Sequence, residues 1–283
     1  MKLLRVGPVG EERPAVRDDN GRVFDPGGVT ADIDGAFLAR GGIDTARRAL
    51  AAGVLPEIET SGLRTGAPVA RPGKVVCVGL NYRDHAEETG APVPQRPAVF
   101  MKAPCTVVGP NDTVLIPRGS VKTDYEVELA VVTGRTTRYL ESPDESLVNV
   151  AGYAISNGVS EREFQLERSL QWDLGKSCET FNPLGPYLVP ADDVGDPRDL
   201  GLHLSVNGLP RQDGHTKDMI FDASYLVWYL SRHMVLEPGD VINTGTPAGV
   251  ALGLPGQPYL RPADVVEVAI DGLGSQRQEV AAA

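Results

Sequence analysis

The sequence predicts an α+β fold with a curved, strand-rich core and few helices, and three observations lead to this prediction. Gly and Pro are abundant, with 32 and 23 residues in a chain of 283, which favours many turns over long helices. Short apolar runs of strand length recur from residue 74 onward, whereas few stretches have helical spacing. Strands alternate with helices too rarely for a doubly wound sheet, and neither a GxGxxG nor a P-loop spacing occurs.

The first 70 residues differ from the rest and are predicted to form a small N-terminal α/β domain with its linker. One helix is predicted from 44 to 53, with Asp44 as its N-cap and Gly53 at its end. The stretch 60–73 is rich in Gly, Pro and polar residues, which is typical of a linker. Residues 71–283 are then predicted to form the main domain.

The main domain is predicted to consist mostly of strands. Residues 74–80 form a continuous apolar run, which is typical of a buried strand. Turn-forming pairs such as Asn207-Gly208 and Asp271-Gly272 separate several of the later ones. The predicted strands are 74–80, 112–116, 125–132, 152–159, 200–206, 241–244 and 265–270. Two helices are predicted in this domain, at 161–172 and 221–234.

Composition and charge exclude several function classes. The formal net charge is −11 and no basic stripe is present, so we expect neither a nucleic acid nor an anionic membrane as partner. No window approaches 18 apolar residues, and the N-terminus lacks the apolar run of a secretory signal. Cys77, Cys105 and Cys178 are widely spaced without a CxxC pattern, as expected for reduced thiols of a cytoplasmic protein.

The segment 123–132 carries acidic residues at every second position. Because side chains alternate between the two faces of a strand, Asp124, Glu126 and Glu128 are predicted to point the same way. Three neighbouring carboxylates repel one another, and a hard cation such as Mg²⁺ or Mn²⁺ would turn that repulsion into coordination. The alternative is a strand face exposed to solvent.

A second pattern follows the strand predicted at 74–80. His85 and Glu88 are three residues apart in a short predicted helix, so they share one face of it. A carboxylate beside an imidazole orients the ring and raises its basicity, as a general base requires. The alternative is an exposed helical turn with an incidental pair.

Two loops complete the candidate chemistry. Lys176 precedes a Pro- and Gly-rich stretch, and a lysine beside an oxyanion could stabilise developing negative charge. The loop 243–250 offers backbone N–H groups and hydroxyls that suit a carboxylate. The alternatives are a surface lysine and a simple tight turn.

These segments, taken together and in this order, strongly resemble the fumarylacetoacetate hydrolase family over roughly residues 73–275. The segments that carry the resemblance are GLNYRDHAEE, the Phe100-Met101-Lys102 stretch, DYEVELAVV, GYAISNGVSERE, KSCETFNPLGP, KDMIF and PGDVINTGTPAGV. The resemblance implies a mixed, barrel-like β-roll with a variable N-terminal domain, and a homodimer. It also implies Mg²⁺ or Mn²⁺ and a small-molecule substrate, either a 2-oxo acid or a β-dicarbonyl compound.

The resemblance also assigns roles to individual residues. Glu126 and Glu128 would be metal ligands, and His85 and Glu88 would be an acid–base dyad on a mobile lid. Lys176 would contact the enolate oxygen. The substrate-binding residues that the resemblance implies are Arg83, Gln165, Thr180 and Thr246.

One position departs from the family pattern. The family carries an Asp as the third metal ligand in the segment that here reads Asn157-Gly158-Val159-Ser160, which places Gly158 at that position. Glycine has no side-chain ligand, so we expect the metal site to be weakened or lost, with Asp124 as a candidate substitute.

The resemblance therefore predicts a hydrolase or lyase that cleaves, decarboxylates or isomerises its substrate through a metal-stabilised enolate. The departure at Gly158 leaves a repurposed, metal-independent enzyme of a specialised pathway as the alternative. A catalytically dead binding protein is a third reading, which the retained dyad disfavours.

Overall fold

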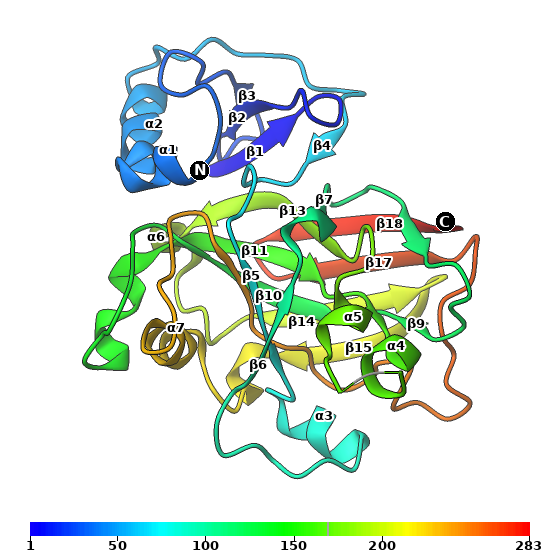
Figure 1. Ribbon diagram of the computed structural model, residues 1–283. Helices are drawn as coiled ribbons and strands as arrows, with labels where there is room; N and C mark the ends of the chain where they lie inside the picture. Colours follow the sequence, from blue (N-terminus) through cyan, green and yellow to red (C-terminus); the bar gives the residue numbers. More distant parts are fainter. Residues whose placement is uncertain (169) are drawn as a thin grey trace.

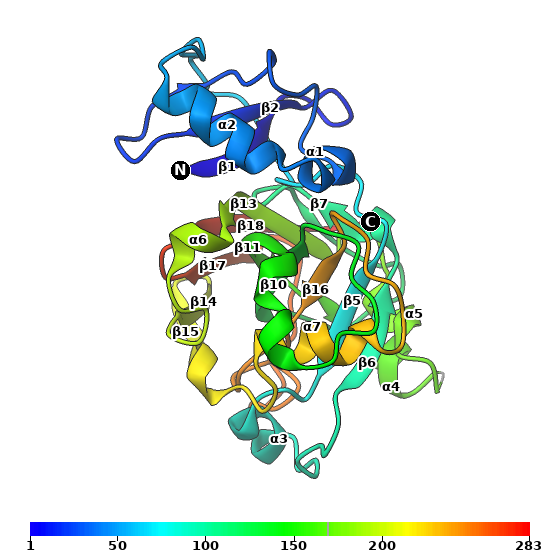
Figure 2. The same ribbon diagram turned by 90° about the vertical axis from the view of Figure 1, so that its left-hand side faces the viewer.

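The predicted α+β class is confirmed by a computed structural model, which describes residues 1–168 and 170–283. Strands dominate the chain and assemble into mixed sheets, while the helices are few and short. Figures 1 and 2 show the strands curving around a common core, with α3, α4, α5 and α7 on the outside. No helix in the described part is long and apolar enough to cross a membrane.

The largest sheet combines strands from both ends of the chain. Its strands are β1 (Lys2–Val6), β2 (Arg13–Arg17), β3 (Val23–Phe24), β4 (Thr65–Gly66), β5 (Val75–Gly79), β6 (Ala98–Lys102), β7 (Val107–Val108), β10 (Val127–Thr133), β11 (Val150–Asn157), β13 (Asn182–Pro190) and β16 (Val241–Asn243). The order is β3-β2-β1-β13-β11-β10-β16-β5-β6, with β4 on β1 and β7 on β13. The strand β10, which carries Glu128 and directly follows Glu126, therefore lies inside this sheet.

A second sheet packs against the first. Its strands are β8 (Val114–Ile116), β14 (Gly201–Val206), β15 (Leu209–His215), β17 (Val265–Ile270) and β18 (Gly274–Ala282), in the order β15-β14-β17-β18-β8. A short pair, β9 (Thr123–Asp124) and β12 (Ser160–Glu161), lies beside the acidic segment. Val127 and Leu129 of β10 enter the core cluster that contains Leu202 and Val268 of the second sheet.

The helices cover the sheets and carry part of the candidate site. The α-helices are α1 (Gly35–Ala39), α2 (Gly42–Ala51), α3 (Arg83–Glu88), α4 (Arg162–Leu166), α5 (Asp173–Lys176), α6 (Ala191–Val194) and α7 (Ala223–Ser231). The 3₁₀ turns are η1 (Pro104–Thr106), η2 (Pro143–Glu145), η3 (Leu147–Asn149) and η4 (Thr216–Asp218). The helix predicted near 221–234 is present as α7.

The predicted strands of the main domain are all present to within a few residues, as β5, β8, β10, β11, β14, β16 and β17. The single helix predicted over 161–172 is wrong, because α4 ends at Leu166 and α5 starts at Asp173. Residue 169 of that prediction lies outside the described residues. A Cβ on Gly175 would overlap the backbone of Glu161 and Gln165, so only glycine allows α5 to fold back so closely onto α4.

The first 70 residues are attached to the main sheet by one strand pair. Leu3 of β1 faces Leu188 of β13, so β1, β2 and β3 extend the largest sheet (Figure 1). The helix predicted at 44–53 begins two residues earlier, as α2, which places Asp44 in its first turn and not at its N-cap. The domain division at residue 70 remains a prediction.

Candidate active site

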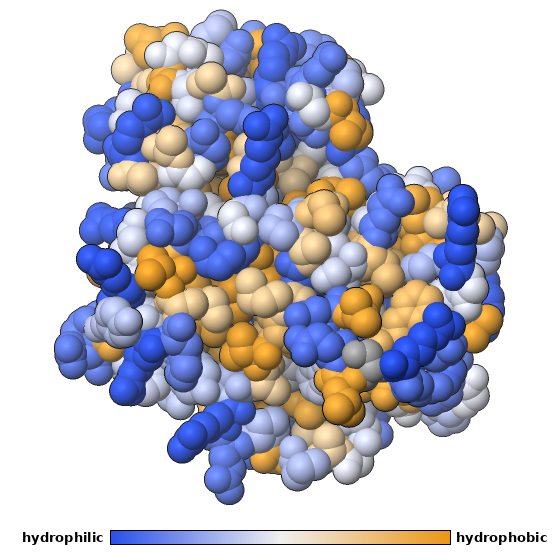
Figure 3. Space-filling model, viewed as in Figure 1, coloured by the Kyte–Doolittle hydropathy of each residue, from blue (hydrophilic) through white to orange (hydrophobic). Residues whose placement is uncertain are grey.

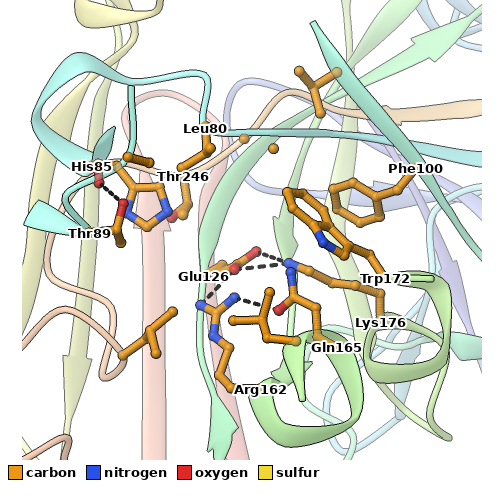
Figure 4. Close-up of a pocket in the computed structure, with 16 residues that line it drawn as sticks. Leu80, His85, Thr89, Phe100, Glu126, Arg162, Gln165, Trp172, Lys176 and Thr246 are labelled. Atoms are coloured by element: carbon orange, nitrogen blue, oxygen red, sulfur yellow. Dashed lines mark hydrogen bonds and ion pairs between the residues drawn. The ribbon is translucent and has the colours of Figure 1, made fainter. Parts of the chain in front are cut away.

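A cavity of about 270 Å³ opens between α3, α4, α5 and the ends of β5 and β10, and Figure 4 shows its interior. His85 and Thr246 lie on one side, Trp172 and Lys176 on the other, and Glu126 between them. The side chains and backbone that line it belong to Val78, Gly79, Leu80, His85, Thr89, Ala91, Phe100, Glu126, Arg162, Gln165, Leu166, Trp172, Lys176, Gly245, Thr246 and Leu252.

The short helix α3 brings the predicted dyad together. His85 Nδ1 and Glu88 Oε2 are 3.5 Å apart, and both atoms are buried without a hydrogen bond to any described residue. Glu88 is oriented by the backbone N–H of Gly249, which donates to its Oε1 at 2.9 Å. The imidazole lines the cavity and has the Glu88 carboxylate beside it, so a base and a partner that can orient it are close together.

Two basic side chains hold Glu126. Lys176 Nζ donates to both carboxylate oxygens at 2.8 and 2.9 Å, and Arg162 Nη2 lies 2.8 Å from Oε1. Ser160 Oγ also donates to Oε1, at 3.2 Å. All four groups are buried, so the pairing takes place away from bulk water. Three of these four contacts fall on Oε1, whereas Lys176 contacts Oε2 as well.

The pKa values of the two glutamates are shifted in opposite directions. Burial alone would raise the pKa of Glu126, but the charges of Lys176 and Arg162 lower it to about 2. Burial and then the negative charge of Glu126 raise the pKa of Glu128 to about 7. The charge of Glu126 is therefore firmly fixed in the folded protein, whereas that of Glu128 is not.

Glu128 fills the space beside Gly158. Its Oε2 accepts a hydrogen bond from the N–H of Gly245 at 2.6 Å. A Cβ built on Gly158 would overlap Glu128 Oε1 and lie 3.1 Å from Glu126 Oε2. The missing side chain at residue 158 thus leaves room that the Glu128 carboxylate occupies.

Asp124 is not free to act as a substitute ligand. Its Oδ1 accepts from the N–H groups of Tyr125 at 2.9 Å and Ala251 at 2.8 Å, and its Oδ2 accepts from the N–H of Leu252 at 3.0 Å and from Arg162 Nε at 2.8 Å. The sequence placed this carboxylate correctly on the same side as Glu126, because both reach Arg162. Its bonds, however, tie it to the loop around residue 251. Within the described residues, no group of three His, Cys, Asp or Glu side chains is placed to hold a metal ion.

The other predicted residues divide into two groups. Gln165 and Thr246 line the cavity, and Thr246 Oγ1 accepts a hydrogen bond from Gln212 at 2.7 Å. Arg83 is exposed on α3 and does not line the cavity. Thr180 lies outside it as well, where its hydroxyl accepts from the N–H of Leu115 at 2.8 Å.

The sequence analysis did not identify Arg162 as a site residue, nor the aromatic side of the cavity that Trp172 and Phe100 form. Trp172 and Phe100 meet edge to face with ring centroids 5.7 Å apart, and Lys176 Nζ lies 4.9 Å from the centroid of Phe100. Exposed leucines extend this apolar surface over α4 and α5, as Figure 3 shows for that region: Leu166, Leu170 and Leu174. A lone arginine or tryptophan carries no spacing signal, so only the fold could reveal these contacts.

Comparisons with known proteins agree with this geometry. The model of the fumarylacetoacetate (FAA) hydrolase C-terminal family matches residues 74–281. The chain is 46% identical to the 2,4-didehydro-3-deoxy-L-rhamnonate hydrolase of Sphingomonas sp., over 99% of this chain and 96% of that protein.

Two solved structures have the same fold over nearly the full length of both chains. One is a fumarylacetoacetate hydrolase from Exiguobacterium antarcticum, with a TM-score of 0.85, 37% identity and full coverage of both chains. The other is a maleylpyruvate hydrolase from Sphingobium sp. SYK-6, solved with manganese and pyruvate. It has a TM-score of 0.82, 26% identity, and coverage of 100% of this chain and 99% of that one.

Proposed function

The chain belongs to the fumarylacetoacetate hydrolase family, and from that premise we propose that it hydrolyses a C–C bond in a 2-oxo acid or β-dicarbonyl substrate through an enolate. The observation that carries the proposal is that His85, with Glu88 3.5 Å away, faces Lys176 and Glu126 across one cavity (Figure 4). A 46% identical relative and a 37% identical solved structure are named as hydrolases, whereas the solved isomerases are 29–31% identical, which supports hydrolysis over isomerisation.

In the proposed reaction, His85 takes a proton from water as the water oxygen attacks the carbonyl carbon beside the bond to be cleaved. The C–C bond then breaks, its electron pair passes to the neighbouring carbon, and the enolate of the shorter 2-oxo acid forms. The proton that His85 took from water passes to that carbon, which yields the second product and regenerates His85. Glu88, held by Gly249, orients the imidazole and balances the charge that His85 gains.

Two further groups bind the substrate in this proposal. Lys176 faces the cavity and would stabilise the negative charge that develops on the enolate oxygen. The hydroxyl of Thr246 would bind the substrate carboxylate, with Gln165 as a further hydrogen-bond partner.

A divalent cation is implied by the family, and such an ion in this fold would chelate two substrate oxygens and stabilise the enolate. Glu126 and Glu128 would be its ligands here. They do not fit the role well, because Glu126 is occupied by Lys176 and Arg162 and the third position is Gly158. This mismatch favours the metal-independent version of the enzyme over the metal-dependent one.

We also propose a homodimer, a cytoplasmic location and a small-molecule substrate for this protein. The family resemblance supports a homodimer and a cytoplasmic location, and the acidic composition disfavours nucleic acid. A small-molecule substrate agrees with a cavity of about 270 Å³.

The test is the turnover of a panel of acylpyruvates and oxaloacetate by the wild type and by the H85A and E88A variants. We expect the H85A rate to fall by a factor of about 10²–10⁴, the usual contribution of a general base. E88A should fall less, since it removes only the orienting group. If both variants retain the wild-type rate, the dyad is not catalytic and the proposed function is wrong.

A further inference from the structure

We infer that the cavity of this chain has no resident divalent-cation site, and that Arg162 and Lys176 supply the positive charge at Glu126 where the cation would lie. The inference deepens the proposed function, since it states which groups would neutralise the substrate oxygens. The absence of a divalent-cation site is a statement about binding, so it can be tested without measuring turnover.

The first step of the argument is the space at residue 158. A third carboxylate would have to start from the Cβ of that residue, and this position overlaps Glu128 Oε1. Glu128 is fixed there by the N–H of Gly245, which donates to its other oxygen at 2.6 Å. The space of the missing side chain is thus taken by Glu128 Oε1. Because Glu128 is already one of the two expected ligands, the number of ligands does not rise.

The second step is the occupancy of Glu126. Lys176 and Arg162 make three contacts of 2.8–2.9 Å with its two oxygens. Ser160 adds a fourth. A cation bound by both oxygens of Glu126 would have to displace the ammonium group of Lys176, and that charge would remain buried in the cavity wall.

The third step is the lack of a replacement. Asp124, the nearest other carboxylate on this face, accepts four hydrogen bonds of its own, one of them from Arg162. Moving it towards the cavity would break its bonds to the loop at Ala251 and Leu252. Among the described residues, Glu128 Oε1 is then the remaining oxygen of this cluster, too few for a hard cation that seeks several.

The fourth step is the charge of the cluster. Asp124, Glu126 and Glu128 contribute at most three negative charges, and Arg162 and Lys176 contribute two positive ones. At most one negative charge remains to attract a dication in a buried place where opposite charges interact strongly. Arg162 and Lys176 both line the cavity, so a substrate oxyanion could reach their positive charges there.

The experiment measures Mn²⁺ binding directly, by equilibrium dialysis with metal analysis, in the presence and absence of oxalate as an enolate mimic. The wild type should show no saturable binding up to about 1 mM Mn²⁺. The G158D variant, which adds a carboxylate and pushes Glu128 aside, should bind Mn²⁺ at least about tenfold more tightly. The matched control is G158A, which fills the same space without charge and should behave as the wild type.

One equivalent of Mn²⁺ bound by the wild type, strengthened by oxalate, would overturn the inference even if G158D fails to fold. The role of Arg162 and Lys176 is tested by thermal melting of the wild type in EDTA. Oxalate should raise the melting midpoint, because it binds the folded state. If oxalate raises the melting midpoint only when Mn²⁺ is added, or does not raise it at all, this role of Arg162 and Lys176 is refuted. Inactivity towards every substrate, together with absent Mn²⁺ binding, would instead refute only the proposed function.

Discussion

At the scale of single residues, the glycines around the cavity decide where its carboxylates lie. Gly158 admits the carboxylate of Glu128, and Gly253 admits that of Glu88. Gly249 has a φ of 102° and donates its N–H to Glu88. Glu128 and Glu88 can therefore take their positions because the residues facing them are glycines, which leave the space free.

This arrangement predicts the effect of a single methyl group. In the G253A variant, the new Cβ would overlap the Glu88 carboxylate and push it away from Gly249 and His85. We expect kcat to fall about tenfold or more while the melting temperature changes little, because misplacement of an orienting group costs rate. G28A is the control, since a Cβ there has no heavy atom within 4 Å. Equal rates in the two variants would show that Glu88 need not be fixed.

The sequence could predict only part of this chemistry. Alternation along 124–128 correctly placed the acidic side chains on one face, with Tyr125 and Val127 in the core. The resemblance located the missing ligand at Gly158. Neither could show that Asp124 is tied to Ala251, because that contact spans more than a hundred residues.

At the scale of elements, α4 and α5 give the cavity two different walls. Arg162 and Gln165 of α4 supply polar groups, whereas Trp172, just before α5, packs on Phe100 of β6. Leu166 and Leu252 extend the apolar side. A substrate with a charged 2-oxo acid end and an apolar tail would match both walls.

The W172A variant tests that match. Removing the indole should raise KM about tenfold for an acylpyruvate with a long alkyl chain, because each buried CH₂ contributes about 0.8 kcal/mol. KM for acetylpyruvate, which is too short to need this wall, should stay near the wild-type value and serves as the internal control. An equal rise for both substrates would mean that Trp172 supports the fold and does not select the tail.

Two elements are not predictable from local sequence patterns. The strand β13 has three prolines and lies between β1 and β11, but its residues read as a Pro- and Gly-rich loop. The helix predicted at 161–172 ends at Leu166, and Gly175 lets α5 pack closely onto α4. Local patterns predicted the strands with continuous apolar runs and missed the elements that tertiary packing determines.

At the scale of the whole molecule, the N-terminal strands and the catalytic sheet share one core. Leu3 is fully buried, belongs to the same apolar cluster as Leu184 and Val241, and faces Leu188 of β13. We expect the chain to unfold in one transition, since this cluster links both ends of the sheet.

The L3A variant measures this linkage. Truncating a fully buried leucine should cost about 3 kcal/mol of the free energy of unfolding, and the whole transition should move together. L209A is the control, because Leu209 is 59% exposed and its loss should change stability by less than about 0.5 kcal/mol. A separate early transition in L3A, with the remaining signal unmoved, would show that the N-terminal segment folds independently.

The most direct test of the account is the steady-state rate of acylpyruvate cleavage by EDTA-dialysed wild-type protein, measured before and after Mn²⁺ is added back. We predict cleavage in EDTA at a rate that Mn²⁺ does not raise, because His85, Glu88, Lys176 and Arg162 belong to the chain itself. A rate that is absent in EDTA and restored by Mn²⁺ would contradict the account.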